Sequence, residues 1–166
     1  GSARCEREAR AAVKIKSEHV ARVIDVGTLE TGAPFMVMEF LEGEDLAQRL
    51  RARGALAVQE TVDFVLQACE AIAEAHSLGI VHRDPNPANL FVTRRADGSV
   101  CIKVLDFGIS KLTVPGGGAD LGMTKTTSVM GSPLYMSPEQ MSSTRNVDMR
   151  TDIWALGVIL YEILSG

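Results

Sequence analysis

Apolar residues near the start of the chain fall into two short runs that predict a β-hairpin. The stretch 20–26 is rich in β-branched residues, and the stretch 34–40 is largely apolar. Thr31 and Gly32 lie between the two runs and supply the turn. Residues 4–16 differ, because charges of both signs alternate there with Ala and Val, which is typical of a surface helix.

Three helices are predicted further along the chain. A polar turn at 42–45 offers an N-cap to a short helix that ends at Gly54. Over 58–78 the apolar residues recur at helical spacing, and Gly79 ends this helix. The last helix, 151–164, is apolar nearly all round, so we expect it to be buried in the centre of the fold.

The part of the chain between the second and third of these helices is predicted to form short strands. We expect the strands at 80–81, 90–93 and 101–105. Asp97 and Gly98 supply a turn between the last two. Residues 113–131 are rich in Gly, Thr and Ser, and they predict a loop of the kind that often carries function.

The composition indicates one globular unit. The 166 residues are 46% hydrophobic, which is enough for one sizeable core. The 17 Lys and Arg against 21 Asp and Glu give a net charge of −4. Proteins that bind nucleic acid usually carry a basic excess, so we expect no nucleic-acid partner. The three cysteines are widely spaced and form no CxxC motif, which indicates neither a disulfide framework nor a zinc site and fits a cytoplasmic location.

The sequence predicts no membrane segment and no signal peptide. Its longest apolar stretch, 153–164, is interrupted by Gly157 and Glu162 and is shorter than a bilayer requires. No basic segment followed by an apolar core opens the chain. The chain also begins without Met, which allows that it is part of a longer protein.

Two polar groups of residues at the ends of predicted strands are candidates for chemistry. One is His82-Arg83-Asp84, with Asn89 five residues after the aspartate, and the other begins at Asp106. On neighbouring strands, Asn89 and Asp106 can offer oxygen ligands to one hard cation, as Mg²⁺ on a polyphosphate requires. Asp84 would then lie beside the metal and could accept a proton from an attacking hydroxyl, which suits phosphoryl transfer.

These motifs resemble, in order and spacing, those of protein kinases. The segments HRDPNPAN at 82–89, DFG at 106–108 and SPE at 137–139 are similar to the catalytic loop, the metal-binding loop and the end of the activation segment. One tripeptide is weak evidence, but three in order, followed by DIWALG at 152–157, are specific. The pattern looks most like the bacterial serine/threonine kinases of eukaryotic type, from about Cys5 onward.

The resemblance implies an α+β, kinase-like fold in two parts. Residues 1–41 would form a remnant of the small lobe. Residues 42–166 would form part of the large lobe, including the activation segment at 106–139. It also implies that the γ-phosphoryl group of ATP, with Mg²⁺ present, is transferred to Ser or Thr hydroxyls of protein substrates.

Several positions match the nucleotide-binding residues of the family. Glu8 looks like the glutamate that pairs with the nucleotide-holding lysine, although one more charge on a solvated helix is the alternative. Met38 resembles the gatekeeper, and the backbone of Glu39 and Leu41 resembles the hinge that binds adenine.

The resemblance also implies catalytic and regulatory roles. Asp84 looks like the catalytic base, and Asn89 and Asp106 look like the metal ligands. Asp152 looks like the aspartate that anchors the catalytic loop. Arg83 resembles the arginine that binds a phosphorylated activation loop, and Thr124 and Thr126 resemble phosphorylation sites in that loop. We expect His82 to pack as a core histidine behind Phe107 rather than to act in catalysis.

The chain departs from the kinase pattern in ways that bear on activity. No GxGxxG motif and no small-lobe lysine motif occurs, and the helices that complete the large lobe are not encoded in these residues. Asn86 stands at the position of the catalytic-loop lysine, and losing such a charged partner costs about a hundredfold in rate in other enzymes. We therefore expect the 166 residues alone to be a poor catalyst. A catalytically impaired, pseudokinase-like binding or scaffold module stays open as the alternative.

Overall fold

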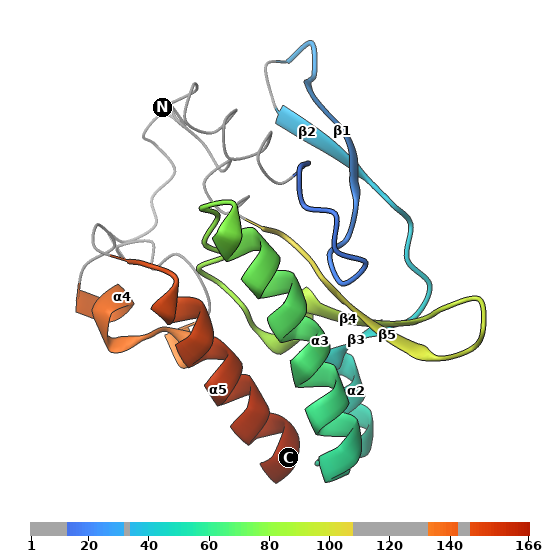
Figure 1. The fold of residues 1–166 in the computed structure, drawn as a ribbon, viewed down its shortest axis with the longest axis vertical. Helices are drawn as coiled ribbons and strands as arrows, with labels where there is room; N and C mark the ends of the chain where they lie inside the picture. Colours follow the sequence, from blue (N-terminus) through green and yellow to red (C-terminus); the bar gives the residue numbers. More distant parts are fainter. Residues whose placement is uncertain (1–12, 32–33, 108–132, 143–146) are drawn as a thin grey trace, which may run out of the picture.

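A β-hairpin lies at one end of the structure and two long helices run side by side at the other (Figure 1). The hairpin consists of β1 (Val23–Thr28) and β2 (Pro34–Met38), and the helices are α3 (Val58–Ser77) and α5 (Arg150–Ser165). The structure is a computed structural model, and it describes residues 13–31, 34–107, 133–142 and 147–166. Most of the helix predicted at 4–16 and all of the loop predicted at 113–131 lie outside these residues.

The predicted hairpin is confirmed, with a later start. β1 and β2 pair antiparallel from Val23 opposite Met38 to Thr28 opposite Pro34. Val20 and Ala21 take another partner, because Val20 forms a parallel bridge with Val104 and the N–H of Ala21 donates to the Val104 carbonyl. This bridge draws the start of the predicted strand away from the hairpin and onto the second sheet.

The second sheet has three antiparallel strands in the order β3 (Glu44–Asp45), β4 (Leu90–Arg94) and β5 (Val100–Val104). The predicted strands at 90–93 and 101–105 are therefore confirmed. Gly43 precedes β3 with a φ of 146°, and a Cβ atom there would lie 2.1 Å from the carbonyl oxygen of Val92. Only glycine allows the chain to approach β4 this closely at that backbone angle.

The strand predicted at 80–81 does not form. The N–H of Ile80 donates to the carbonyl oxygen of Ala75 at 2.9 Å, which completes the end of α3. The N–H of His82 donates instead to the side chain of Asp152. The backbone donors on either side of Val81 are thus committed to a helix end and to a carboxylate, so this apolar pair joins no sheet.

α2 (Leu46–Arg53) and α3 begin and end where the sequence predicts, but residues 13–16 form a turn and an irregular segment rather than the end of the helix predicted at 4–16. Asp45 caps α2, because its carboxylate accepts the N–H of Gln48 at 2.8 Å, and Gly54 follows the last turn. Gly79 has a φ of 75° and donates to the carbonyl of His76 at 2.9 Å, so α3 ends in a Schellman motif. This left-handed turn reverses the chain toward residues 80–89.

The prediction that the last helix is buried in the centre of the fold is wrong for the described residues. One face of α5 is buried against α3, including Leu156, Ile159 and Ile163. The opposite face is exposed, with Ile153 at 57% and Tyr161 at 74%. Described elements pack on one side of α5 only, which explains the difference. No helix in the described part of the chain is long and apolar enough to cross a membrane.

The core lies between α3, the second sheet and the buried face of α5. Its largest fully buried apolar side chains are Leu46, Ile72, Leu90, Ile102, Val104, Ile159 and Ile163. These residues come from five different elements, so the core fixes how the helices sit against the sheet.

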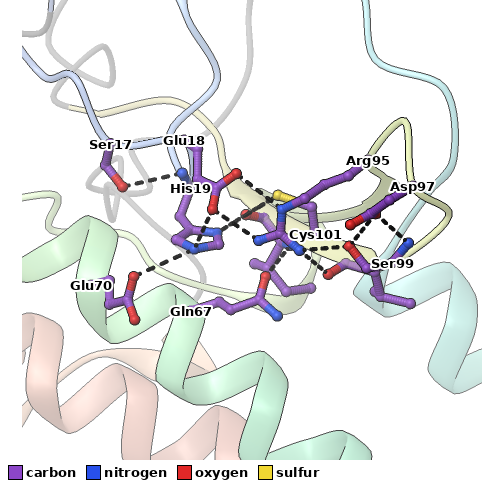
Figure 2. Close-up of polar contacts among 11 residues, drawn as sticks. Ser17, Glu18, His19, Gln67, Glu70, Arg95, Asp97, Ser99 and Cys101 are labelled. Atoms are coloured by element: carbon purple, nitrogen blue, oxygen red, sulfur yellow. Dashed lines mark hydrogen bonds and ion pairs between the residues drawn. The ribbon is translucent and has the colours of Figure 1, made fainter.

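Residues 17–20, before β1, are fastened to the β4–β5 hairpin and to α3 (Figure 2). Both Nε and Nη2 of Arg95 lie 3.0 Å from the Glu18 carboxylate. The ring of His19 donates from Nδ1 to the carbonyl of Ile102 at 3.0 Å, and its Nε2 lies 3.4 Å from the Glu70 carboxylate. The chain therefore enters the first hairpin from a fixed position on the second sheet.

Candidate active site

The loop 82–89 joins α3 to β4, and a buried carboxylate on α5 holds its start. Asp152 has no exposed surface. Its Oδ2 accepts the N–H of His82 at 2.9 Å, and its Oδ1 accepts the N–H of Arg83 at 2.8 Å. A third donor, Nε2 of His76 on α3, lies 2.7 Å from Oδ2. Together these donors compensate the desolvation of the buried charge.

Asp84 lies where two side-chain amides converge on its backbone carbonyl. Nδ2 of Asn89 and Nδ2 of Asn86 each donate to the Asp84 oxygen at 3.0 Å. The loop is therefore closed on itself from residue 84 to residue 89. Because the nitrogen of the Asn89 amide points at the Asp84 carbonyl, its side-chain oxygen points away from that carbonyl within the same amide plane.

Asn86 is engaged at both ends of its side chain within the same loop. Its Oδ1 accepts the N–H of Ala88 at 3.0 Å and so caps the short 3-10 helix Pro87–Asn89. The sequence interpretation gave Asn86 no such role. Its amide stabilises the loop that carries Asp84, whatever part it plays in catalysis.

Asp106 follows β5 in a left-handed backbone conformation, with a φ of 60°, and its side chain is exposed. The next residue, Phe107, is buried and packs on the His82 ring at a centroid distance of 4.8 Å. The Leu105 N–H donates to the carbonyl of Asn89 at 2.9 Å. Asn89 and Asp106 are therefore neighbours at the base of two adjacent strands, as the sequence predicts.

His82 is a buried packing residue, as expected. Nε2 donates to the Leu105 carbonyl at 2.8 Å, and Nδ1 accepts the N–H of Asp84 at 3.3 Å. Both ring nitrogens are used by backbone groups, so the ring links the loop 82–89 to the turn that carries Asp106.

A small hollow beside Asp106, of about 10 Å³, extends toward the first hairpin. It is lined by Val20, Ala21, Val23, Met38, Val104, Asp106 and Phe107. Met38 ends β2, so the residue matched to the gatekeeper and the residue matched to a metal ligand line the same hollow. Glu39 and Leu41 follow Met38 in the segment that joins β2 to β3.

Glu39 is held by three hydrogen bonds at the start of this segment. Its N–H donates to the Arg22 carbonyl at 2.9 Å, and its Oε1 accepts the N–H of Arg22 at 2.8 Å and Nζ of Lys103 at 2.9 Å. Burial raises the pKa of Glu39, but the bonds from Lys103 and Arg22 outweigh it and hold the pKa below its usual value. Sequence reasoning missed Lys103, because no local pattern brings β5 to this segment.

The donor set fits Mg²⁺ better than a transition metal. No group of three or more His, Cys, Asp or Glu residues that could hold a metal occurs among the described residues. Asn89 and Asp106 instead offer an amide oxygen and a carboxylate. Mg²⁺ is commonly held by one or two such protein oxygens and by substrate phosphates.

The segment around 133–142 packs under the loop 82–89. Nε2 of Gln140, on α4 (Pro138–Ser142), donates to the Arg83 carbonyl at 2.7 Å. Nε of Arg83 is buried and has no hydrogen-bond partner among the described residues. The residues that it was predicted to meet, Thr124 and Thr126, lie outside the described residues, as does Glu8.

Tyr135 ties the same segment to α5. Its hydroxyl donates to the Glu162 carboxylate at 2.6 Å. Burial and this carboxylate raise the pKa of Tyr135, so the phenol remains a donor at neutral pH. Sequence reasoning missed His76, Gln140 and Tyr135, since each acts through a partner far away in the sequence.

Comparison with known proteins identifies a single family over nearly the whole chain. The family described as "Protein kinase domain" matches residues 2–166. The chain is 40% identical over 166 residues to "Serine/threonine-protein kinase pkn3" of Myxococcus xanthus, which covers 99% of this chain and 30% of that protein. It is 36% identical to "Serine/threonine-protein kinase PknB" of Mycobacterium leprae, over 98% of this chain and 25% of that protein.

Solved structures give the same match. The crystal structure of the Mycobacterium tuberculosis PknI kinase domain superposes with a TM-score of 0.75 at 28% identity. That alignment covers 98% of this chain and 56% of the PknI chain. The chain thus spans between 22% and 30% of the curated relatives named serine/threonine kinases and about half of the solved domain.

Proposed function

The chain belongs to the protein kinase family, and from this premise we propose that it is part of an ATP-dependent serine/threonine protein kinase whose catalytic loop is residues 82–89. The observation that carries the proposal is the anchoring of this loop by Asp152, next to the turn that presents Asp106. Such a rigid loop supports a side chain that must meet a substrate at a defined position.

Asp84 acts as the catalytic base in this proposal. The hydroxyl oxygen of a substrate Ser or Thr forms a bond to the γ-phosphorus of ATP, the bond from that phosphorus to the β–γ bridging oxygen breaks, and ADP leaves. Asp84 orients the hydroxyl and accepts its proton. The hydrogen bonds to the Asp84 carbonyl from Asn86 and Asn89 support this role, because they fix the backbone from which the carboxylate extends.

Members of the family use ATP and Mg²⁺, and Asn89 and Asp106 would hold the metal in this chain. When bound, Mg²⁺ neutralises charge on the phosphates of the nucleotide. The protein's own contribution is to hold the two oxygen ligands on neighbouring strands. The left-handed backbone at Asp106 supports this assignment, since unusual backbone geometry in a non-glycine residue is often kept for function.

The other end of the nucleotide would lie against the first hairpin. We assign Met38 as the gatekeeper and the backbone of Glu39 and Leu41 as the adenine-binding hinge, and Glu8 as the partner of a nucleotide-holding lysine. The division into a small-lobe part, 1–41, and a large-lobe part, 42–166, follows from the same assignment. The hollow shared by Met38 and Asp106 supports it.

Regulation would act through the activation segment, 106–139. Arg83 would pair with a phosphate on Thr124 or Thr126. Its Nε is buried and unpaired among the described residues, which supports a role in meeting a group of this kind. The substrates would be proteins with an exposed Ser or Thr, and a cytoplasmic location and the lack of a nucleic-acid partner stay predictions.

We do not propose the scaffold alternative. Its motivations were Asn86 and the absence of a GxGxxG motif from these 166 residues. Asn86 has an evident structural role as a cap, and the similar curated proteins are named serine/threonine kinases. The absence of a lysine at this position is expected to lower the rate rather than to abolish binding.

The experiment is phosphate transfer from γ-labelled ATP to a generic protein substrate, with the full-length protein. Asp84→Asn should reduce transfer about 10³-fold or more, because the base and its charge are lost together. Asp97→Asn is the matched control, since Asp97 is an exposed aspartate in the β4–β5 turn whose carboxylate bonds only to Ser99 within the described part of the chain. No transfer by the unmodified protein, or equal transfer by the two variants, would refute the proposal.

A further inference from the structure

A ring of hydrogen bonds joins the segment after β2 to the strand that leads to Asp106. Lys103 lies on β5, three residues before Asp106, and its Nζ is 2.9 Å from Oε1 of Glu39. Glu39 in turn bonds to both the N–H and the carbonyl of Arg22, at 2.8 and 2.9 Å. One glutamate therefore connects two stretches of the chain that are far apart in sequence.

The ring closes through the backbone. The N–H of Ala21, next to Arg22, donates to the carbonyl of Val104 at 3.0 Å, and Val104 is next to Lys103. The N–H of Val104 donates to the carbonyl of His19 at 2.8 Å, which is a second hydrogen bond between β5 and the segment before β1. Within this ring, the contact between Lys103 and Glu39 is the link that joins two side chains.

This ion pair is shielded from water. The side chain of Lys103 is 16% exposed and that of Glu39 is 21% exposed. A charge-assisted hydrogen bond with this degree of burial is stronger than one on the surface, where water and salt screen the charges. The Lys103 contact is therefore able to influence the positions of the segments that it joins.

The ring borders the hollow between the proposed adenine and metal ends of the nucleotide site. Ala21 and Val104 belong both to the ring and to the lining of the hollow, which also includes Met38 and Asp106. A change in the ring would thus alter the separation between the hinge backbone and the Asp106 turn.

We propose that Lys103 is a positioning residue for nucleotide binding, because its ion pair with Glu39 sets the separation between the adenine-binding backbone and the metal-binding carboxylate. Lys103 itself need not touch the nucleotide. This inference rests on the proposed function, since it concerns the same ATP site.

The test is steady-state kinetics of Lys103→Met in the full-length protein. The KM for ATP should rise about three- to tenfold, while kcat changes less than twofold. A displaced hinge weakens the binding of ATP equally in the ground state and in the transition state, so the loss appears in KM. Lys103→Arg keeps the charge and should return KM to within twofold of the unmodified value.

Arg95→Met is the matched control. Arg95 is also a cation of the β4–β5 hairpin, and its ion pair with Glu18 fastens the segment before β1 to the same sheet (Figure 2). This pair lies outside the ring and does not touch Glu39. Arg95→Met should leave the KM for ATP unchanged within twofold.

The pH profile separates positioning from general destabilisation. The hydrogen bonds from Lys103 and from the backbone N–H of Arg22 hold the pKa of Glu39 below its usual value. In the unmodified protein, protonation of Glu39 at low pH breaks its ion pair with Lys103, so the KM for ATP should rise there. Lys103→Met has no ion pair left to break, so its KM should stay nearly constant over the same pH range. A merely structural loss would leave the rise of KM at low pH in place.

Three results would contradict the positioning role of Lys103. An unchanged KM in Lys103→Met, an equal rise in Arg95→Met, or a rise of KM at low pH in Lys103→Met equal to that of the unmodified protein would overturn the inference. If Lys103→Met does not fold, Lys103→Gln, which keeps a polar side chain that is uncharged and one atom shorter, is measured against the same controls by equilibrium binding of magnesium-ATP. Failure of the unmodified protein to bind ATP would instead refute the proposed function, and this inference with it.

Discussion

The carboxylate of Asp152 accepts the backbone N–H of Arg83 at 2.8 Å, at a residue whose φ is 73°. A left-handed backbone at a non-glycine residue costs about 1–3 kcal/mol, so it persists only where other contacts fix it. The hydrogen bond from Arg83 supplies such a contact one residue before Asp84. A buried group on α5 thereby holds the proposed catalytic loop in its strained form.

Removing this carboxylate should destabilise the fold and the loop together. Asp152→Ala leaves the N–H groups of His82 and Arg83 without their acceptor, and we expect a loss of about 3 kcal/mol in the free energy of unfolding. Urea unfolding of the full-length protein measures it. Asp148→Ala is the control, because Asp148 is exposed near the start of α5 and, among the described residues, its carboxylate bonds only to Arg150. A loss below about 0.5 kcal/mol in Asp152→Ala would contradict the anchoring role.

Replacing Asn86 should raise turnover at a small cost in stability. Asn86→Lys places a cation beside the transferred group, and we expect kcat to rise about tenfold. It also removes the cap on the 3-10 helix Pro87–Asn89, which costs about 1 kcal/mol. Rate assays and thermal unfolding of the same samples measure both effects. An unchanged kcat would show that the position does not limit the rate.

The sequence predicts the local elements of this fold better than their partners. The first hairpin, α2 and α3 form as expected, because capping residues such as Asp45 and Gly79 act within a few residues. The strand expected at 80–81 fails, because its neighbours bond to Ala75 and Asp152 instead. Apolar character alone could not show which backbone groups were already used.

The residues of the candidate site also fall into two groups, those that sequence motifs indicate and those that only the structure shows. The motifs indicate Asp84, Asn89 and Asp106, and the structure links Asn89 both to Asp84 and to Leu105, the neighbour of Asp106. The α+β kinase-like fold is confirmed by the match to solved kinase domains. The contact between Lys103 and Glu39 could not be predicted, since it requires the segment after β2 and the strand β5 to be placed in space first.

Tyr135→Phe should loosen the segment 133–142 from α5. The variant removes only the hydroxyl that donates to Glu162 at 2.6 Å, and we expect a loss of about 1–2 kcal/mol in the free energy of unfolding. Urea unfolding is the measurement. Tyr161→Phe is the matched control, because the Tyr161 side chain is 74% exposed on the same helix. Equal stability of the two variants would show that the Tyr135 contact contributes nothing.

Magnesium-ATP should stabilise the full-length protein through Asp106. At a concentration of 100 times Kd, ligand binding adds about 2.7 kcal/mol to the free energy of unfolding, which raises Tm by several degrees. Asp106→Asn should remove most of this rise, because the amide keeps an oxygen but loses the charge. Asparagine also tolerates the left-handed backbone at this position, so the variant should fold. A rise in Tm equal to that of the unmodified protein would exclude Asp106 as a metal ligand.

The most direct measurement is a crystal structure of the full-length protein, or of its complete kinase domain, with magnesium and a non-hydrolysable ATP analogue. We predict a metal ion about 2.0–2.1 Å from the side-chain oxygen of Asn89 and from the carboxylate of Asp106, with the Asp84 carboxylate facing the γ-phosphate. A metal that binds neither Asn89 nor Asp106, or an Asp84 carboxylate turned away from the nucleotide, would contradict the account.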